Sequence, residues 1–162
     1  MKHYKTGLVI GRFQPFHSGH IYLLEASFAL CDALVIVIGS SNKKDRSNPF
    51  SYLLRKEMIE HFLKKEGYTE KVKMIFSSID IPDDYAWRDA ILKKAGSIDV
   101  VIGNNQKGSN IFFAKAGYPI HRVSLHKRYL YEGTRIRKLM QEKKPWENRV
   151  PSYVEKLIKK NE

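Results

Sequence analysis

Three short apolar segments of this 162-residue chain each run without interruption into a glycine. They read TGLVIG at residues 6–11, ALVIVIG at residues 33–39 and DVVIG at residues 99–103. Unbroken Val/Ile runs without polar alternation are typical of parallel strands that are buried on both faces of a sheet. Residues 72–76 and, more weakly, residues 119–123 have the same character and bring the expected number of strands to about five.

The segments between these strands have the apolar spacing of helices. Ile21, Leu24 and Phe28 recur at helical intervals, and Asn48-Pro49 predicts the start of the next helix, an N-cap followed by proline. Further helices are expected over residues 87–94, 134–142 and 151–160. This alternation predicts an α/β fold, a Rossmann-like doubly wound parallel sheet with right-handed crossovers. We expect one domain, residues 1–162, with short C-terminal helices (about 134–162) packed on it.

The chain is strongly basic and has a single cysteine. Lys and Arg number 29 against 17 Asp and Glu, and the net charge of +12 indicates a polyanionic partner: nucleic acid, acidic lipid or a phosphorylated small molecule. The lone Cys31 excludes an internal disulfide and a cysteine-based metal cluster. Because no apolar run is long enough to cross a bilayer and the N-terminus lacks a secretion signal, we expect a cytoplasmic protein that does not enter membranes.

The segment GRFQPFHSGH at residues 11–20 lies where an α/β fold binds its ligand, after a strand and before a helix. It lacks the glycine patterns of dinucleotide folds and P-loops. Instead, His17 and His20 share one face of the first helical turn, beside unpaired backbone N–H groups that favour an anion. Two imidazole donors there suit a phosphate whose charge grows during reaction. The alternatives are a zinc site, for which a third ligand is missing, and simple capping by Ser18.

This segment resembles the motif of the HxGH-type nucleotidyltransferases, in particular the archaeal-type nicotinamide mononucleotide adenylyltransferases. YEGTRIR at residues 131–137 is similar to the family's second phosphate motif, [ST]xTxxR, and Pro145-Trp146 is followed by a short terminal helix as in the family. The resemblance implies an HxGH-type fold with His17, His20 and Arg137 as catalytic residues. The ATP-binding residues that it implies are Gly11, Arg12, Phe13, His17, His20, Arg46, Gly133, Thr134 and Arg137.

Two positions in these motifs carry alternatives. Glu132 stands where the family has a serine-like residue; because a carboxylate repels phosphate, it should point elsewhere or meet a magnesium ion. Arg46 is the nearest candidate for the family's arginine before the Asn48-Pro49-Phe50 element, and a solvated charge run explains it equally well. Thr134 can cap the helix that it begins.

The residues that are expected to bind the second substrate, the acceptor nucleotide, are assigned by weaker matches to the same family. Asp80 and Trp87, seven residues apart, resemble the nicotinamide-side segment, and an indole can stack on a pyridinium ring. Asn104 and Asn105 follow the fourth strand, where an amide can bind a carboxamide or ribose, and which of the two is in register stays open. A tryptophan of the core or of an interface is the alternative for Trp87.

The resemblance implies adenylyl transfer: the phosphate of nicotinamide mononucleotide (NMN) attacks the α-phosphorus of ATP in line, giving NAD and pyrophosphate. Mg²⁺ is expected on the ATP phosphates and not on protein side chains, and a homo-oligomer is expected. One alternative is an HxGH enzyme with another acceptor, such as phosphopantetheine, FMN or a polyol phosphate. The other is a basic nucleic-acid-binding module, which is disfavoured because no exposed aromatic–basic interleaving is found.

Overall fold

The computed structural model describes residues 2–104 and 108–162 and contains one five-stranded, wholly parallel sheet. The strand order is β3-β2-β1-β4-β5, which confirms the predicted Rossmann-like α/β class. The strands are β1 (Tyr4–Gly11), β2 (Cys31–Ile38), β3 (Val72–Ser77), β4 (Val100–Gly103) and β5 (Ile120–Arg122).

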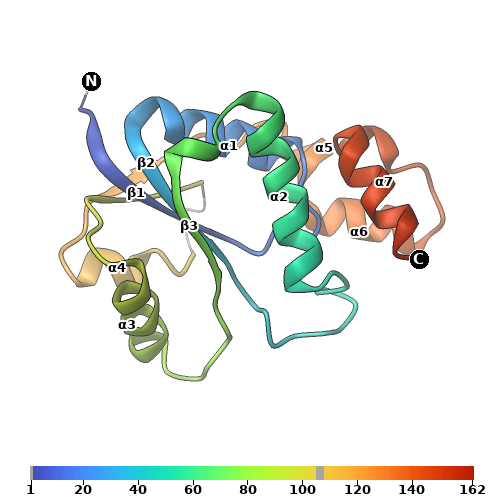
Figure 1. Ribbon diagram of the computed structural model, residues 1–162. Helices are drawn as coiled ribbons and strands as arrows, with labels where there is room; N and C mark the ends of the chain where they lie inside the picture. Colours follow the sequence, from blue (N-terminus) through green and yellow to red (C-terminus); the bar gives the residue numbers. More distant parts are fainter. Residues whose placement is uncertain (1, 105–107) are drawn as a thin grey trace.

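Helices cover both faces of the sheet (Figure 1). One face carries α1 (Ser18–Leu30), α2 (Tyr52–Glu66), α5 (Arg128–Tyr131), α6 (Gly133–Gln141) and α7 (Ser152–Lys160). The other face carries α3 (Asp84–Ala95) and α4 (Ile111–Lys115). Two short 3-10 turns, η1 (Thr69–Lys71) and η2 (Glu147–Arg149), complete the elements.

The apolar runs are unbroken because successive side chains enter two different cores. Leu8, Val35 and Val37 belong to the core under α3 and α4. Val9 and Ile36 belong to the core under α1 and α2, and all five side chains are fully buried. A strand that is covered on both faces has no solvent side, so it has no polar alternation.

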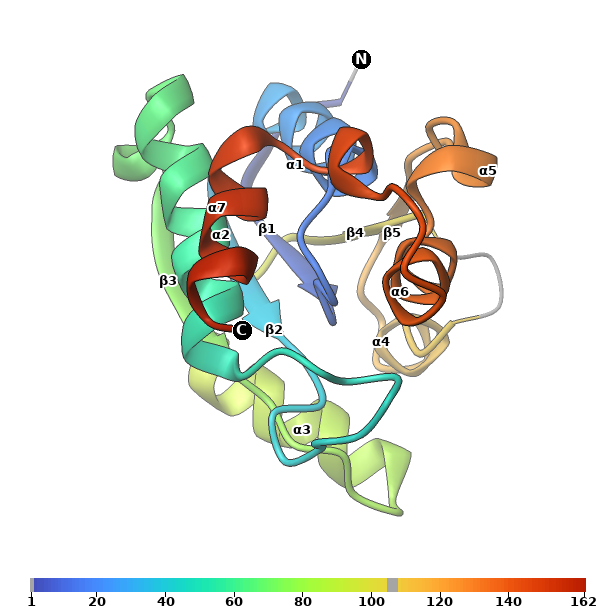
Figure 2. The same ribbon diagram turned by 90° about the vertical axis from the view of Figure 1, so that its right-hand side faces the viewer.

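The strand order places the ligand crevice at β1. The chain steps outward from β1 to β2 and β3, and then returns to the opposite side of β1 with β4. Such a reversal opens a crevice at the carboxyl ends of the two strands between which it occurs, here at Gly11 and Gly103. Figure 2 turns this edge of the sheet toward the viewer, with α1, α6 and the loop after β2 around the end of β1.

Helix starts differ from the sequence-based predictions. The prediction that Asn48-Pro49 begins a helix is wrong: α2 begins at Tyr52, and its N-cap is Ser51, whose Oγ accepts the Leu54 N–H at 3.2 Å. Thr134 does not cap α6 either, because the N-cap is Glu132, which makes no side-chain capping bond. The short helices α4 and α5 were not expected from the sequence.

The C-terminal segment packs on the core of the α1/α2 face. Trp146, Val150, Val154 and Leu157 are buried in the same cluster as the side chains of β1 and β2. In the part of the chain that the structure describes, no helix combines the length and apolarity needed to span a membrane.

Candidate active site

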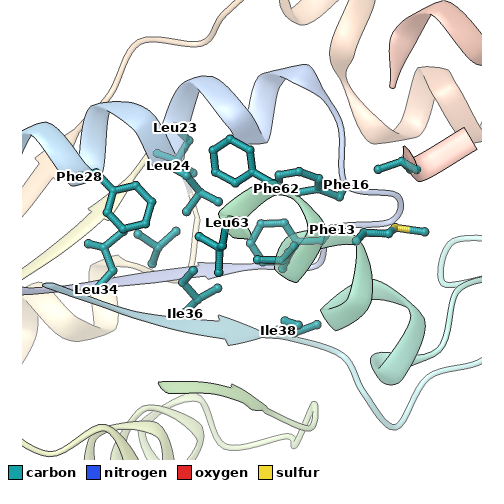
Figure 3. Close-up of a cluster of buried hydrophobic side chains, with 14 of the residues drawn as sticks. Phe13, Phe16, Leu23, Leu24, Phe28, Leu34, Ile36, Ile38, Phe62 and Leu63 are labelled. Atoms are coloured by element: carbon teal, nitrogen blue, oxygen red, sulfur yellow. The ribbon is translucent and has the colours of Figure 1, made fainter. Parts of the chain in front are cut away.

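The loop between β1 and α1 has a strained start. Phe13 has a left-handed backbone, with φ of +53°, which is uncommon outside glycine. Its ring is 1% exposed and packs in the core with Phe16, as Figure 3 shows. The side chain of Phe13, which the resemblance implies for ATP binding, therefore lies in the core, with its ring centroid 4.7 Å from that of His20.

His17 and His20 cap their own helix. His17 is the N-cap of α1, and its Nδ1 accepts the Gly19 N–H at 3.1 Å. The Nδ1 of His20 accepts the His17 N–H at 3.2 Å, which completes a reciprocal capping box. The start of α1 is therefore capped, as one of the alternatives proposed, but the two histidines provide the cap in place of Ser18.

Burial determines the charge of both rings, and these contacts determine their tautomer. Burial, and then the charge of Arg137, lowers the pKa of His17 from 6.5 to about 3. Burial, and then His17, lowers the pKa of His20 well below its usual value. Both imidazoles are therefore neutral at pH 7. Since each Nδ1 accepts a backbone N–H, each proton is assigned to Nε2, which remains available to donate to a ligand.

Gly19 is required by the packing of the His17 ring. A Cβ at this position would lie 2.9 Å from Cε1 and 3.0 Å from Nδ1 of His17. Any larger residue between the histidines would push the His17 ring away from its capping position. The glycine of the HxGH motif therefore allows the His17 ring to pack closely against the backbone of the helix.

Arg137 joins α6 to the loop after β1. Its Nη1 donates to the Gln14 carbonyl at 2.8 Å, and its Nη2 donates to the Thr134 Oγ1 at 3.3 Å. The residue is 7% exposed, and burial followed by the charge of Arg12 lowers its pKa. Arg137 also acts electrostatically on His17, so the second motif lies against the first as the sequence predicted.

A side chain at the start of α6 would pack tightly against the first motif. A Cβ on Gly133 would lie 3.0 Å from the Arg137 Nη1 and 3.4 Å from the Gln14 carbonyl oxygen. Glu132 turns outward and pairs with Arg128 at 3.0 Å and with Arg135 at 3.4 Å. Of the two alternatives for Glu132, these ion pairs favour the one in which its carboxylate points away from phosphate.

The loop after β2 holds Arg12. An Arg12 Nη1 donates to the Asn48 Oδ1 at 3.3 Å, and Asn48 in turn donates through its amide to Asp45 at 3.0 Å. Arg46 is exposed, and its carbonyl accepts a bond from Gln141 of α6. The conformation of the loop after β2 therefore depends on contacts with Arg12, which follows β1, and with Gln141 of α6.

Arg55 is a functional candidate that the sequence analysis missed. It is 1% exposed and donates to the carbonyls of Arg12 at 2.6 Å, Gly39 at 2.8 Å and Ser51 at 3.2 Å. Burial, and then the charge of Arg12, lowers its pKa to about 10. Arg55 thereby ties the ends of β1 and β2 to the start of α2. An arginine on the buried stripe of an amphipathic helix was the available signal.

Gln14 is a second missed residue. Its side-chain amide exchanges two hydrogen bonds with the backbone of Phe50, both at 2.9 Å. Because its carbonyl also accepts from Arg137, Gln14 connects the first motif with the loop after β2 and with α6. The burial of Gln14 is seen only in the structure, so the sequence carried no signal for this junction.

A cavity of about 470 Å³ opens at the carboxyl edge of the sheet. Its described lining contains the predicted residues Gly11, Arg12, Asp80, Trp87 and Asn104. Of the residues predicted to bind ATP, only Gly11 and Arg12 line this space together with the acceptor-side residues; His17 and His20 are not among its described lining residues. Asn105, the alternative to Asn104, lies outside the described residues.

A second cavity, of about 530 Å³, lies between the loop after β2 and the C-terminal helices. It is lined by Arg46 and Arg137 together with apolar side chains such as Phe50 and Trp146. Arg46 and Arg137 thus line this second cavity together, while Arg12 lines the cavity at the carboxyl edge of the sheet.

The described residues offer no protein-based metal site. Among residues 2–104 and 108–162, no group of three or more His, Cys, Asp or Glu side chains could hold an ion. A Mg²⁺ site that combines one or two carboxylates with substrate phosphates would not require such a group.

Comparisons with known proteins agree with this geometry. The cytidylyltransferase-like family model matches residues 8–139. The nicotinamide-nucleotide adenylyltransferase of Thermococcus kodakarensis is 34% identical over 156 residues, which span 96% of this chain and 82% of that protein. The protein of the same name from Saccharolobus solfataricus is 34% identical over 153 residues, 94% of this chain and 88% of its own length.

Solved structures share the fold. A bifunctional NMN adenylyltransferase/ADP ribose pyrophosphatase from Francisella tularensis superposes with a TM-score of 0.80 at 25% identity over 91% of this chain. This chain covers 45% of that larger protein. The same Francisella protein has also been solved as a complex with AMP and a manganese ion. The chain belongs to the cytidylyltransferase-like family, in the group that contains the archaeal nicotinamide-nucleotide adenylyltransferases.

Proposed function

We propose that this protein joins ATP and NMN to give NAD and pyrophosphate. The observation that carries the proposal is the meeting of two motifs at the end of β1. His17 and His20, whose Nδ1 atoms accept backbone N–H groups, lie beside Arg137. Arg12 of the same loop lines the cavity of Asp80 and Trp87. The names of the relatives agree with the reaction that the sequence implies. They do not favour phosphopantetheine, FMN or a polyol phosphate as the acceptor.

The reaction needs no nucleophile from the protein. An oxygen of the NMN phosphate forms a bond to the α-phosphorus of ATP, and the bond from that phosphorus to the bridging oxygen of the β-phosphate breaks, so pyrophosphate leaves. Cys31 is unsuited to attack, because it lies at the amino end of β2 and burial raises the pKa of its thiol to about 11. Catalysis then consists of positioning two anions and stabilising charge in the transition state.

The described residues supply donors for that charge. The Nε2–H groups of His17 and His20 and the amino end of α1 would donate to the phosphoryl oxygens. Arg137 and Arg12 would bind the remaining phosphates, with Arg46 nearer to the outer ones. Such donors are held in place before the substrate arrives, so little reorganisation is needed during the reaction.

A divalent cation would complete the site. Magnesium on the ATP phosphates would neutralise oxygens that the arginines do not reach. We propose Mg²⁺ as the physiological ion; the manganese in the Francisella complex supports the use of a divalent metal. We also propose that the protein is cytoplasmic and that it forms a homo-oligomer. Light scattering would measure the oligomeric state.

A pyrophosphate-release assay tests the function. The protein is incubated with ATP, MgCl₂ and NMN, and NAD is measured in the same samples by an alcohol dehydrogenase reaction. The proposal requires pyrophosphate and NAD in equal amounts. Pyrophosphate release with FMN or phosphopantetheine but not with NMN would refute it, and so would oligonucleotide binding without turnover of ATP.

A further inference from the structure

A cluster of charged side chains lies at the start of α6, on the same helix as Arg137. Glu132 directly precedes the helix, and its carboxylate pairs with Arg128 of α5 at 3.0 Å and with Arg135 of α6 at 3.4 Å. The side chains of Arg128 and Arg135 are 62% and 57% exposed, whereas that of Glu132 is 30% exposed. The carboxylate is therefore the least exposed group of the cluster.

The negative charge of Glu132 lies close to Arg137. Gly133, the next residue along the chain, is so near to Arg137 that a Cβ on it would lie 3.0 Å from the Arg137 Nη1. Burial, and then the charge of Arg12, lowers the pKa of Arg137, and Glu132 is one of two carboxylates whose charge opposes this shift. A carboxylate that attracts the Arg137 guanidinium also repels an anion bound to that guanidinium.

The side chain of Glu132 contributes little to the helix itself. Glu132 is the N-cap residue of α6, but its carboxylate makes no capping bond. Its backbone carbonyl accepts the Arg135 and Ile136 N–H groups at 3.0 and 3.1 Å, and a change of side chain leaves these bonds in place. Ion pairs with exposed arginines add little to stability. The charge of Glu132 is therefore the property through which it acts.

That charge affects the pyrophosphate product most. When the bond to the α-phosphorus breaks, the bridging oxygen leaves with pyrophosphate and adds a negative charge to it. The cations proposed to bind the ATP phosphates, Arg12, Arg46 and Arg137, would then attract the product more strongly than the substrate. Product release limits the turnover of many enzymes. A carboxylate fixed beside Arg137 counteracts this attraction.

We infer that Glu132 weakens the binding of pyrophosphate at the start of α6 and so favours its release. The inference rests on the proposed function and adds to it a residue that sets the affinity for the product. Glu132 acts through Arg137 and is a positioning residue. Arg128 and Arg135 act in the opposite direction, because they neutralise part of the charge of the carboxylate.

The opposite charges of the cluster allow a test that separates charge from structure. The variants are Glu132→Gln, Arg128→Gln and Arg135→Gln. The matched control is Glu142→Gln, which removes a carboxylate beyond the other end of α6, where it pairs with Lys144 at 3.0 Å. The KM for ATP and the inhibition constant of added pyrophosphate are measured from NAD formation in excess MgCl₂, at low and at high concentrations of KCl.

The inference predicts changes of opposite sign. Glu132→Gln should lower both constants by about 3- to 10-fold, because polyphosphates lose a repelling charge. Arg128→Gln and Arg135→Gln should raise both constants, because the carboxylate loses a compensating cation. All three changes should shrink at high KCl, since ions screen partly exposed charges. Glu142→Gln should keep the wild-type constants.

Three results would overturn the inference while leaving the function intact. The first is a change in the same direction in all three cluster variants, independent of KCl, as expected if the ion pairs only hold α5 against α6. The second is unchanged constants in Glu132→Gln. The third is a raised KM for ATP in Glu132→Gln, as expected of a carboxylate that binds Mg²⁺. If the wild type forms no NAD, the proposed function itself is refuted, and calorimetry with pyrophosphate still compares the affinities of the variants.

Discussion

The imidazole rings of His17 and His20 stack with their centroids 3.7 Å apart and their planes 23° from parallel. In this arrangement the two Nδ1 atoms satisfy backbone donors of the same turn, and the two Nε2 atoms are left for the substrate. The motif is therefore a structural cap and a donor pair at once. Its two roles depend on different nitrogens, so they can be separated by mutation.

Asparagine and glutamine separate these roles at position 20. In His20→Asn the amide can replace Nδ1 as the cap acceptor, while the donor at the Nε2 position is lost. We expect kcat to fall by about 10²–10³-fold, equivalent to about 3–4 kcal/mol of barrier, with the melting temperature nearly unchanged. His20→Ala should lose the same rate and some stability as well.

His20→Gln is the complementary variant, because its amide N–H can reach the Nε2 position. It should retain more activity than His20→Asn in the pyrophosphate-release assay. Near-normal turnover by His20→Ala would exclude a catalytic role for this side chain.

Gly19→Ala tests the close approach beneath His17. The added Cβ would lie 2.9 Å from Cε1 of His17, so the ring must move by a few tenths of an ångström or more. We expect a loss of about 10- to 100-fold in kcat, because reacting groups tolerate little misplacement. Serine at position 18 is outside this contact, and Ser18→Ala serves as the control in the same helical turn. Equal kinetics of Gly19→Ala and wild type would contradict the steric argument.

Arg55 should contribute to both stability and substrate binding. Arg55→Met removes a charged donor from the carbonyls of Arg12, Gly39 and Ser51, and we expect the free energy of unfolding to fall by about 2–3 kcal/mol. Arg55→Lys keeps the charge, but one ammonium group cannot span all three carbonyls, so its effect should be intermediate. Urea unfolding followed by circular dichroism measures both.

The same variants should raise the KM for ATP, since the backbone of Arg12 loses its anchor. A control is Lys56→Met, which removes a cation from the next position of α2 without removing these bonds. An unfolding free energy that is the same in Arg55→Met and in wild type would show that the buried guanidinium has no net effect.

The histidines predict a loss of stability in acid. The pKa of His17 is about 3 in the folded protein and 6.5 when unperturbed, so the unfolded chain binds the extra proton between these values. The stability that this histidine contributes is complete above pH 6.5 and is lost as the pH falls from 6.5 toward 3. The slope for one proton is about 1.4 kcal/mol per pH unit.

His17→Asn isolates this contribution, because asparagine is a good N-cap and does not titrate. The difference in unfolding free energy between wild type and His17→Asn should change with pH between about 6.5 and 4.5 and be constant above about 7. A second check is Arg137→Met, which removes a nearby positive charge and should raise the pKa of His17 in an NMR titration. A difference that is independent of pH would contradict a buried, neutral His17.

The strands of the sheet could be predicted because a strand that is buried on both faces is recognisable from its own unbroken apolar residues. The apolar run that ends at Gly11 places a ligand after the first strand, whereas the crevice between β1 and β4 follows from the strand order, which the sequence does not show. His17 and His20 were visible because they follow a strand that ends in glycine, whereas Arg137 was assigned through the resemblance of its motif to the family's second phosphate motif.

The connections within the site were not predictable. Whether Asn48 begins a helix or holds Arg12 depends on where residue 12 lies in space, and no local pattern distinguishes these roles. Arg55 was detectable only as an arginine on a buried helix stripe. The partners of Arg55 and Gln14 are backbone groups, which have no signature in sequence. Phe13 was assigned to the ligand by its position in the motif, although its ring turned into the core.

The bond from Arg137 to the Gln14 carbonyl also sets an order of events during synthesis. The two residues are separated by 123 positions, so the strands β1 to β5 leave the ribosome before the guanidinium does. A chain that ends before α6 lacks this cation, and it also lacks the C-terminal side chains that bury one face of β1 and β2. Incomplete copies of this protein therefore have neither a complete core nor a complete phosphate site, and they should not turn over ATP.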